Sequence, residues 1–444
     1  MKTEIGKYGC RLAAALLAAI ICSSSAAGCS VQPEPGNVPE ETGTAEPTPL
    51  QEDDAKMDLP FYIDPETAVY DFGEMGKKNK AWNNPQTYTP YWLGNVIYQE
   101  TVLCVDNGKT VSGELEYTPV KILSVRDYTY ETEYVEGTDY TVSGRTLILN
   151  EGTSCPYLTQ ANLNGTEVPK GYTFVASLDK LTDLEKQCVQ FGKAVFSEGT
   201  FYYGHQLCVS YIYDVNELKT DSFGRFGAVC PRTLAKLQAG EEKVIFGVTG
   251  DSVTEGCSAS AYFSHAPYMP TFLNLFQFGL KAAYPDGTIA LKNLAVGGTT
   301  TVQGAEESNI KRLAKTNADT IIIHFGLNDV GALSASQFRK NIETLVNGVR
   351  AELPDCEFLF IKCSTPNPDI HDIERLKSYF REMDELAANT EGFYTLDMYV
   401  LSENMLAHKK YADITGNGVN HINDYMVRLY AMQLLNLFVD YSAN

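Results

Sequence analysis

The second half of the chain alternates short apolar runs, rich in β-branched residues, with longer segments of helical periodicity. The predicted strands cover 244–248, 289–294, 320–324, 357–361 and 393–396, and the predicted helices cover 269–283, 307–315, 336–353, 373–389 and 423–439. Such alternation builds a parallel sheet, because each parallel connection has to cross over the sheet and leaves a helix on one of its faces. We therefore predict a doubly wound α/β domain over residues 241–444.

The preceding segment, residues 58–240, has a different pattern of short strands separated by turn signals. The run Val96–Val105 ends in Asp106-Asn-Gly-Lys109, and Asn-Gly is typical of a β-hairpin. Further strands are expected at 120–125, 128–134, 140–142, 146–149 and 201–213. This spacing predicts an antiparallel β-sandwich. Its aromatic residues, with Trp82 and Trp92, could stack on sugars, but core packing explains them more simply.

The first residues have the features of an export signal. Three basic residues precede the apolar run Leu12–Cys22, and Ala26-Ala-Gly-Cys29 follows it. We interpret 1–28 as a bacterial lipoprotein signal peptide and Cys29 as the lipidated residue, the alternative being a plain secretory signal. Residues 29–57 are rich in Pro, Glu and Thr, as in a disordered tether. The expected location is extracytoplasmic, with attachment to the bacterial membrane through the lipid only.

The charge balance restricts the partners. A formal net charge of −21 on 444 residues disfavours nucleic acid and anionic lipid headgroups. The cysteines beyond Cys29 are scattered, without a Cys-x-x-Cys pair or a histidine cluster. We interpret most of them as small buried hydrophobic residues and predict no metal and no organic cofactor.

Four loops at the predicted sheet edge carry the candidate chemistry. Ser252 follows the first strand in Gly-Asp-Ser, Gly298 follows the second in Val-Gly-Gly, Asn328 follows the third in Gly-Leu-Asn-Asp, and His421 precedes the last helix. The carboxyl ends of parallel strands meet at one edge, so these groups are expected to lie close together. A serine, a base and several N–H donors are what acyl transfer requires.

These four blocks, in this order over residues 243–442, resemble the SGNH (GDSL-type) hydrolase family. The resemblance implies a flavodoxin-like sheet, with Ser252 as nucleophile and His421 as base. It also implies that the backbone amides of Ser252 and Gly298, and the side-chain amide of Asn328, hold the oxyanion.

The sequence departs from the family at one position, because the aspartate common three residues before the histidine is replaced by Gly418. A catalytic imidazole still needs an acceptor to hold its tautomer. We favour a Ser-His dyad oriented by a backbone carbonyl, with Asp413 as the second choice for the acid. Asp424 is better explained as a first-turn residue of a helix that Asn423 caps.

A β-sandwich ahead of an SGNH domain is also similar in architecture to the family 2 carbohydrate esterases. This similarity implies a carbohydrate O-acetyl ester, or another small ester, as the substrate. Two alternatives stay open: a lipase, lysophospholipase or thioesterase using the same site, and a glycan-binding lipoprotein with an inert hydrolase domain.

The other histidines are weaker candidates. His205 and His324 lie within strand patterns and are expected to be structural, while His265 follows the Ser252 loop closely enough to line a pocket. His371 and His408 suggest no role.

Overall fold

The computed structural model describes residues 59–70, 82–240, 243–257 and 259–442. The predicted signal peptide (1–28) and the tether (29–57), including the lipidation candidate Cys29, lie outside these residues. Among the residues described, no helix combines the length and the apolar character needed to cross a membrane.

Five parallel strands form the sheet of the C-terminal half, in the order β14-β13-β15-β16-β17. They are β13 (Lys243–Gly250), β14 (Thr288–Asn293), β15 (Thr320–His324), β16 (Glu357–Lys362) and β17 (Phe393–Asp397). The first strand lies between the second and the third, which is the strand order of flavodoxin-like folds. All residues of β15 and β16 are buried, as expected for strands covered on both faces. The predicted doubly wound α/β architecture is confirmed.

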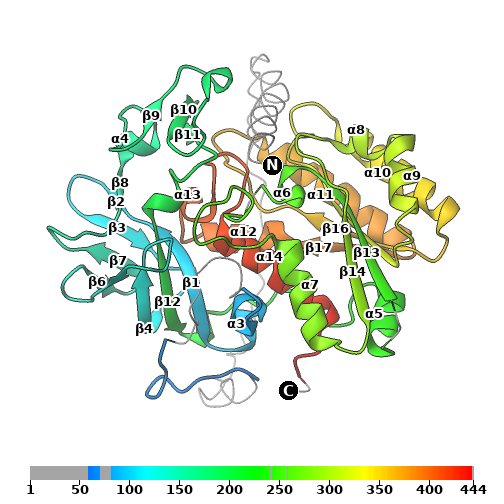
Figure 1. Cartoon of the computed structure of the whole chain (residues 1–444), viewed down its shortest axis with the longest axis horizontal. Helices are drawn as coiled ribbons and strands as arrows, with labels where there is room; N and C mark the ends of the chain where they lie inside the picture. The colour runs from blue at the N-terminus through cyan, green and yellow to red at the C-terminus, as the bar shows by residue number, and fades with distance from the viewer. Residues whose placement is uncertain (1–58, 71–81, 241–242, 258, 443–444) are drawn as a thin grey trace, which may run out of the picture.

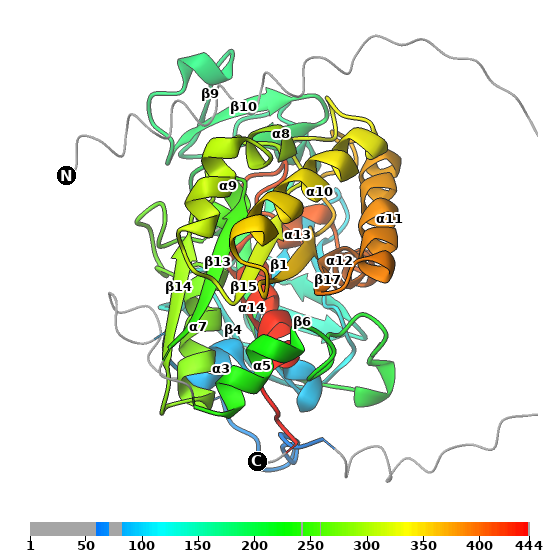
Figure 2. The same ribbon diagram turned by 90° about the vertical axis from the view of Figure 1, so that its right-hand side faces the viewer.

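Helices cover both faces of this sheet. They are α5 (Pro231–Gln238), α6 (Ser252–Glu255), α7 (Phe272–Ala283), α8 (Thr301–Gly304), α9 (Glu307–Ala314), α10 (Ala335–Glu352), α11 (Ile373–Asn389), α12 (Met398–Leu406), α13 (Tyr411–Ile414) and α14 (Asp424–Phe438). Figures 1 and 2 show α9, α10 and α11 on the outer face and α7 and α14 on the face toward the N-terminal half. The loops after the strands, with the short helices α6 and α8, lie at one end of the molecule (Figure 1).

The N-terminal half contains two larger sheets, with strand orders β1-β12-β4-β5 and β6-β7-β3-β2-β8. Their strands are β1 (Val96–Leu103), β2 (Val105–Asp106), β3 (Val111–Glu114), β4 (Pro119–Arg126), β5 (Glu133–Tyr134), β6 (Tyr140–Ser143), β7 (Thr146–Leu149), β8 (Leu158–Thr159) and β12 (Gln206–Tyr213). The pairs β2·β3 and β6·β7 are antiparallel, and the first of them confirms the hairpin predicted at Asn107-Gly108. These sheets fit the predicted β-sandwich. Short helical segments complete this half: α3 (Pro85–Tyr88), α4 (Gln160–Leu163), η2 (Tyr91–Leu93), η3 (Leu178–Lys180), η4 (Tyr203–His205) and η5 (Val215–Glu217).

A third, small sheet was not predicted. It consists of β9 (Thr173–Phe174), β10 (Gln187–Phe191) and β11 (Ala194–Phe196), in the order β11-β10-β9. Figure 1 shows it at the same end of the molecule as α6, α8 and α13. Val189 and Phe196 of this sheet share an apolar cluster with Val419, which lies just before His421 in the sequence. The small sheet therefore contacts the segment that carries the candidate base.

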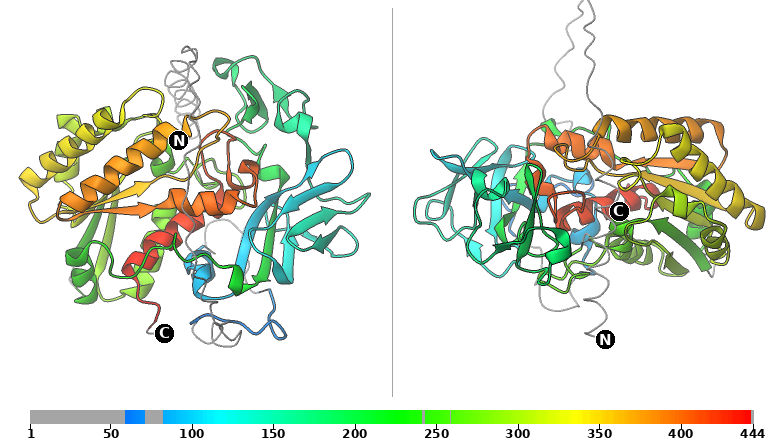
Figure 3. Two further views of the ribbon diagram at one scale, coloured as in Figure 1. Left: turned by 180° about the vertical axis from the view of Figure 1, so that it is seen from behind. Right: turned by 90° about the horizontal axis from the view of Figure 1, so that it is seen from above.

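Helix α14 joins the two halves of the molecule. All of its 15 residues are buried, because α7 lies against it on one side and β1 and α3 on the other. Figure 3 shows it in the middle of the molecule in both views. The guanidinium of Arg428 is buried and donates to the carbonyl oxygens of Thr87 and Tyr98 in the N-terminal half. A buried cation of this kind is tolerated only where hydrogen-bond acceptors surround it.

Several local expectations were tested by the structure. Only Glu133–Tyr134 of the strand predicted at 128–134 forms a strand. Residues 203–205, which were predicted to belong to the strand 201–213, form a 3₁₀ turn before β12. Trp82 and Trp92 are buried, and Trp92 stacks on Phe223, so the core interpretation is confirmed. The eight cysteines from Cys104 to Cys363 are buried and unpaired, as expected of small apolar residues.

Candidate active site

The structure brings Ser252 and His421 together. Ser252 is the first residue of α6, directly after β13, and His421 lies in the loop before α14. The Oγ atom of Ser252 lies 2.9 Å from Nε2 of His421, and both side chains are buried. This is the hydrogen-bond distance that a candidate nucleophile and a candidate base need, and the two loops are 169 residues apart in the sequence.

The other ring nitrogen of His421 contacts a residue that the sequence analysis missed. Its Nδ1 atom lies 3.1 Å from Oε2 of Glu198, two residues beyond β11 in the N-terminal half. An ionised carboxylate can only accept, so Nδ1 carries the proton and Nε2 of the neutral ring is left as the acceptor for the Ser252 hydroxyl. The imidazole thus has the tautomer that a general base needs.

Four effects act on the pKa of His421. Burial alone would lower it, because it disfavours the imidazolium ion. The charge of Glu198, its hydrogen bond to the ring and the charge of Asp251 together outweigh burial, and the pKa is raised above the usual value for histidine. Asp251 itself caps α6 by accepting from the amide of Val253 at 3.1 Å, and burial raises its pKa to about 7.

The predicted oxyanion donors lie on the neighbouring loops. The amide of Ser252 begins α6 and therefore has no acceptor within the helix. Gly298, in the loop after β14, has a φ of +76°, a conformation that glycine adopts without strain. The side-chain amide of Asn328, in the loop after β15, donates to the carbonyl of Thr299 at 3.0 Å and keeps a second N–H.

Short hydrogen bonds fix these loops to one another. The carboxylate of Asp329 accepts from the amide and the hydroxyl of Thr301, at 2.9 and 2.6 Å. The carboxylate of Glu255 accepts from the amide of Gly297 at 2.6 Å. These bonds join the sheet-edge loops to one another, and Asn341 of α10 and Tyr379 of α11 add hydrogen bonds to Thr301 and Asp329.

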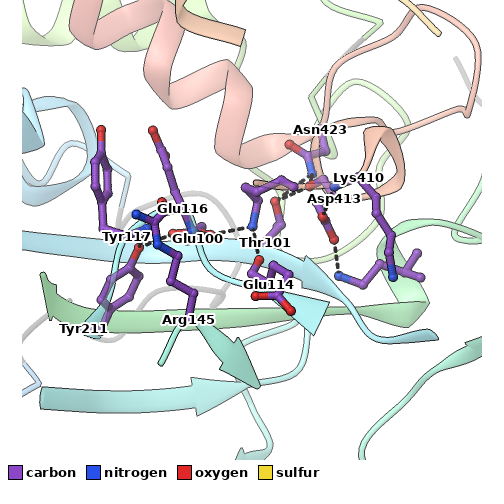
Figure 4. Close-up of polar contacts among 12 residues, drawn as sticks. Glu100, Thr101, Glu114, Glu116, Tyr117, Arg145, Tyr211, Lys410, Asp413 and Asn423 are labelled. Atoms are coloured by element: carbon purple, nitrogen blue, oxygen red, sulfur yellow. Dashed lines mark hydrogen bonds and ion pairs between the residues drawn. The ribbon is translucent and has the colours of Figure 1, made fainter. Parts of the chain in front are cut away.

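The structure contradicts Asp413 as the acid of the site. Its Oδ1 and Oδ2 accept from the amides of Leu103 and Lys410, at 2.6 and 2.8 Å, and its own carbonyl accepts from Thr101 and Asn423. Figure 4 shows Asp413 beside Lys410 and Asn423, at the end of a row of polar side chains along β1. With both carboxylate oxygens bound to backbone groups, Asp413 connects the loop before α14 to β1.

The favoured hypothesis of a dyad oriented by a backbone carbonyl is also wrong, because Nδ1 of His421 contacts a carboxylate. Glu198 was not predicted because it lies outside the four sequence blocks of the candidate site and is 223 positions away from His421. The only signal was indirect: glycine at position 418 meant that an acid, if present, had to come from elsewhere. Asp424 begins α14 after its cap Asn423, as expected, and accepts from the amide of Ser260.

The remaining histidines have structural contacts. His324 bonds Thr254 through Nδ1 at 2.8 Å, and burial lowers its pKa to about 3. His265 is bonded to the carbonyl of Ala266, and its ring packs against Tyr203. His205 is bonded to the carbonyl of Phe201. Burial lowers the pKa of His371 to about 4, so it stays neutral at neutral pH.

The comparison with protein families agrees with this geometry. The model of the GDSL-like Lipase/Acylhydrolase family matches residues 248–426, a segment that contains Ser252, Gly298, Asn328 and His421. Residues 248–426 form a GDSL-like lipase/acylhydrolase domain. Glu198 lies outside this GDSL-like domain, in the N-terminal part of the chain. No curated protein matches the chain.

Some solved structures resemble part of the chain at low identity. A two-domain esterase (CEX) active on acetylated mannans is 19% identical, with a TM-score of 0.40, and the match covers 50% of this chain and 56% of that one. A catalytic mutant of Axe2, an acetylxylan esterase from Geobacillus stearothermophilus, is 16% identical (TM-score 0.36; 45% and 96% covered). A member of the lipolytic G-D-S-L family from Veillonella parvula is 17% identical (TM-score 0.35; 44% and 98% covered).

Proposed function

We propose that this protein is a serine esterase that works through an acyl-enzyme. The Ser252 hydroxyl attacks the ester carbonyl while Nε2 of His421 takes its proton. The amides of Ser252 and Gly298 and the side chain of Asn328 donate to the oxyanion that forms. His421 then protonates the departing alcohol, and a water molecule, deprotonated by the same ring, releases the acid and restores Ser252.

One observation carries this proposal: the 2.9 Å contact between Ser252 Oγ and His421 Nε2, in a GDSL-like domain. Its burial strengthens the electrostatic interactions on which the reaction depends, because little water screens them. The proposed mechanism uses only side chains and amides of this chain.

The substrate we propose is an O-acetyl group on a carbohydrate, with another small ester as the broader class. This substrate class is the one implied by the architectural similarity to carbohydrate esterases that the sequence indicates. The polar character of the surroundings supports it: Glu198, Glu255 and Asn417 lie around the Ser252–His421 pair or on the loops that hold it. A hydroxyl-rich alcohol fits such surroundings better than a long acyl chain, which needs apolar walls.

The test is acetate release by the full chain from acetylated xylan, acetylated mannan and p-nitrophenyl acetate. We expect Ser252→Ala to lower kcat by about 10⁴-fold or more, with an unchanged thermal unfolding midpoint. The matched control is Ser308→Ala on the exposed side of α9, which should keep full activity. Turnover by Ser252→Ala at the wild-type rate would disprove the mechanism.

The same assay separates the alternatives. Serine-dependent hydrolysis of long-chain p-nitrophenyl esters, without acetate release from glycans, would favour a lipase, lysophospholipase or thioesterase. Glycan binding with no hydrolysis of any ester would favour a binding lipoprotein with an inert hydrolase domain.

We also propose that the protein is exported and held at the bacterial cell membrane by a lipid on Cys29, with no nucleic-acid partner. The support is the sequence pattern of residues 1–29 and the net charge of −21. Fractionation should find the wild type in the membrane fraction and Cys29→Ala outside it.

A further inference from the structure

Position 418 has no room for a side chain. Gly418 has a φ of +82°, and a Cβ atom there would lie 2.2 Å from the Tyr202 hydroxyl and 2.2 Å from the carbonyl of Val195. Real Cβ atoms do not approach other atoms so closely, and both neighbours belong to the N-terminal part of the chain. The Tyr202 hydroxyl donates to that same Val195 carbonyl at 2.7 Å, so the obstruction is itself fixed. An aspartate three residues before His421 is therefore excluded by the segment that occupies its place.

The segment that fills this space also brings in a carboxylate. Val195 belongs to β11, and Glu198 follows three residues later. The amide of Ser197 donates to the carbonyl of Asn417 at 3.2 Å, which places the end of β11 against the loop that carries His421. Glu198 is thus held beside the imidazole by the same docking contact that closes off position 418.

Asn417 connects the carboxylate with the loop of the base. Its Nδ2 atom donates to Oε1 of Glu198 at 3.1 Å, which leaves Oε2 for the His421 ring. Its Oδ1 atom accepts from three successive amides, those of Val419, Asn420 and His421, at 2.9 to 3.0 Å. One side chain therefore sets both the direction of Glu198 and the turn that presents His421.

We propose that Glu198 is the positioning acid of the candidate active site, supplied by the N-terminal part of the chain in place of the side chain that Gly418 lacks. It accepts the Nδ1–H of His421, holds the ring toward Ser252 and stabilises the imidazolium that forms during the reaction, while the proton stays on Nδ1. The GDSL-like domain is then incomplete without the small sheet β9–β11. This inference rests on the proposed function.

The first test measures the histidine itself, which needs no substrate. In the full chain labelled with ¹⁵N-histidine, the His421 ring is identified by its absence from His421→Asn and titrated by NMR. The charged groups that act on His421 are Glu198 and Asp251. We expect Glu198→Gln to lower the pKa of His421, because it removes a charge that favours the imidazolium, and Glu198→Asp to keep it closer to the wild-type value.

The second test measures the reaction with p-nitrophenyl acetate. We expect Glu198→Gln to lower kcat by about 10²- to 10⁴-fold with little change in KM, and to move the acid limb of the kcat/KM profile to lower pH. Glu198→Asp should recover part of kcat. The matched control is Glu185→Gln, an exposed glutamate of the same region, which should change neither the titration nor kcat.

Each outcome decides the proposal. A His421 titration that Glu198→Gln does not move overturns it, and so does wild-type kcat in that variant. A wild-type protein that hydrolyses no ester would overturn the proposed function, and the titration would then still decide whether Glu198 holds the histidine.

Discussion

The two sides of the candidate active site are built differently. The side with Ser252, Gly298 and Asn328 consists of loops that follow neighbouring strands of one sheet and bond one another. The side with Glu198 and the His421 loop is held by contacts between residues far apart in the sequence, in which buried charged groups take part. Substitutions on the first side should therefore lower the activity with little change in the free energy of unfolding. Substitutions on the second side should lower the free energy of unfolding as well.

The buried ion pair behind the His421 loop is central to the second side. The Lys409 ammonium is paired with the Glu100 carboxylate, with neither side chain exposed, and donates to the carbonyl of Glu114. Burial opposes the charge on Lys409, but Glu100 and Asp413 outweigh it and raise its pKa, so the lysine is charged. Figure 4 shows Glu100 in the row of polar side chains along β1 that ends at Asp413.

The largest expected effect on stability follows from removing this cation. Lys409→Met leaves the Glu100 carboxylate buried without its counter-ion, and we expect the free energy of unfolding to fall by about 3–5 kcal/mol. Urea unfolding at neutral pH measures it. Lys311→Met is the control, because its partner Glu307 is exposed on α9 and surface pairs contribute little. If the two variants proved equally stable, the second side would not depend on buried charge.

The next effect belongs to the first side. Asn328→Ala removes one of the proposed oxyanion donors, and we expect kcat on p-nitrophenyl acetate to fall by about 10²- to 10³-fold with little change in KM. The free energy of unfolding should fall by only about 1 kcal/mol, for the lost bond to Thr299. Asn309→Ala is the matched control, because the side-chain amide of Asn309 likewise donates to a backbone carbonyl, that of Gly304. This variant should keep the wild-type kcat. An Asn328→Ala enzyme as fast as the wild type would remove Asn328 from the mechanism.

The smallest effect is the pH dependence of the wild type. His421 can take the Ser252 proton only when neutral, and its pKa is raised, so it becomes protonated at a higher pH than an ordinary histidine. As pH falls through this raised pKa, kcat/KM should decline by about tenfold per pH unit. The midpoint should be the same in Lys409→Met, because that variant changes stability and leaves the Glu198–His421 contact in place. A midpoint below the usual histidine range would contradict the charge effect of Glu198.

Predictions from the sequence were most accurate where the signal is local. The strands of the parallel sheet agree with the prediction to within about two residues, since short apolar runs rich in β-branched residues are typical of the strands of a parallel sheet. The small sheet β9–β11 was missed, because its strands are two to five residues long and carry no clear alternation. His205 was placed in a strand because the aromatic run continues through it, while the chain turns there before β12.

The sequence by itself determined the sheet-edge side of the site. Ser252, Gly298 and Asn328 each follow a strand, and parallel strands bring their carboxyl ends together whatever the rest of the chain does. Only the tertiary structure decided which acid faces His421. Asp413 is closer in sequence, but its two oxygens bind the amides of Leu103 and Lys410, whereas Glu198 reaches the ring from a segment docked against Gly418. A carboxylate's partner depends on which groups surround it after packing, and that information is not local in the sequence.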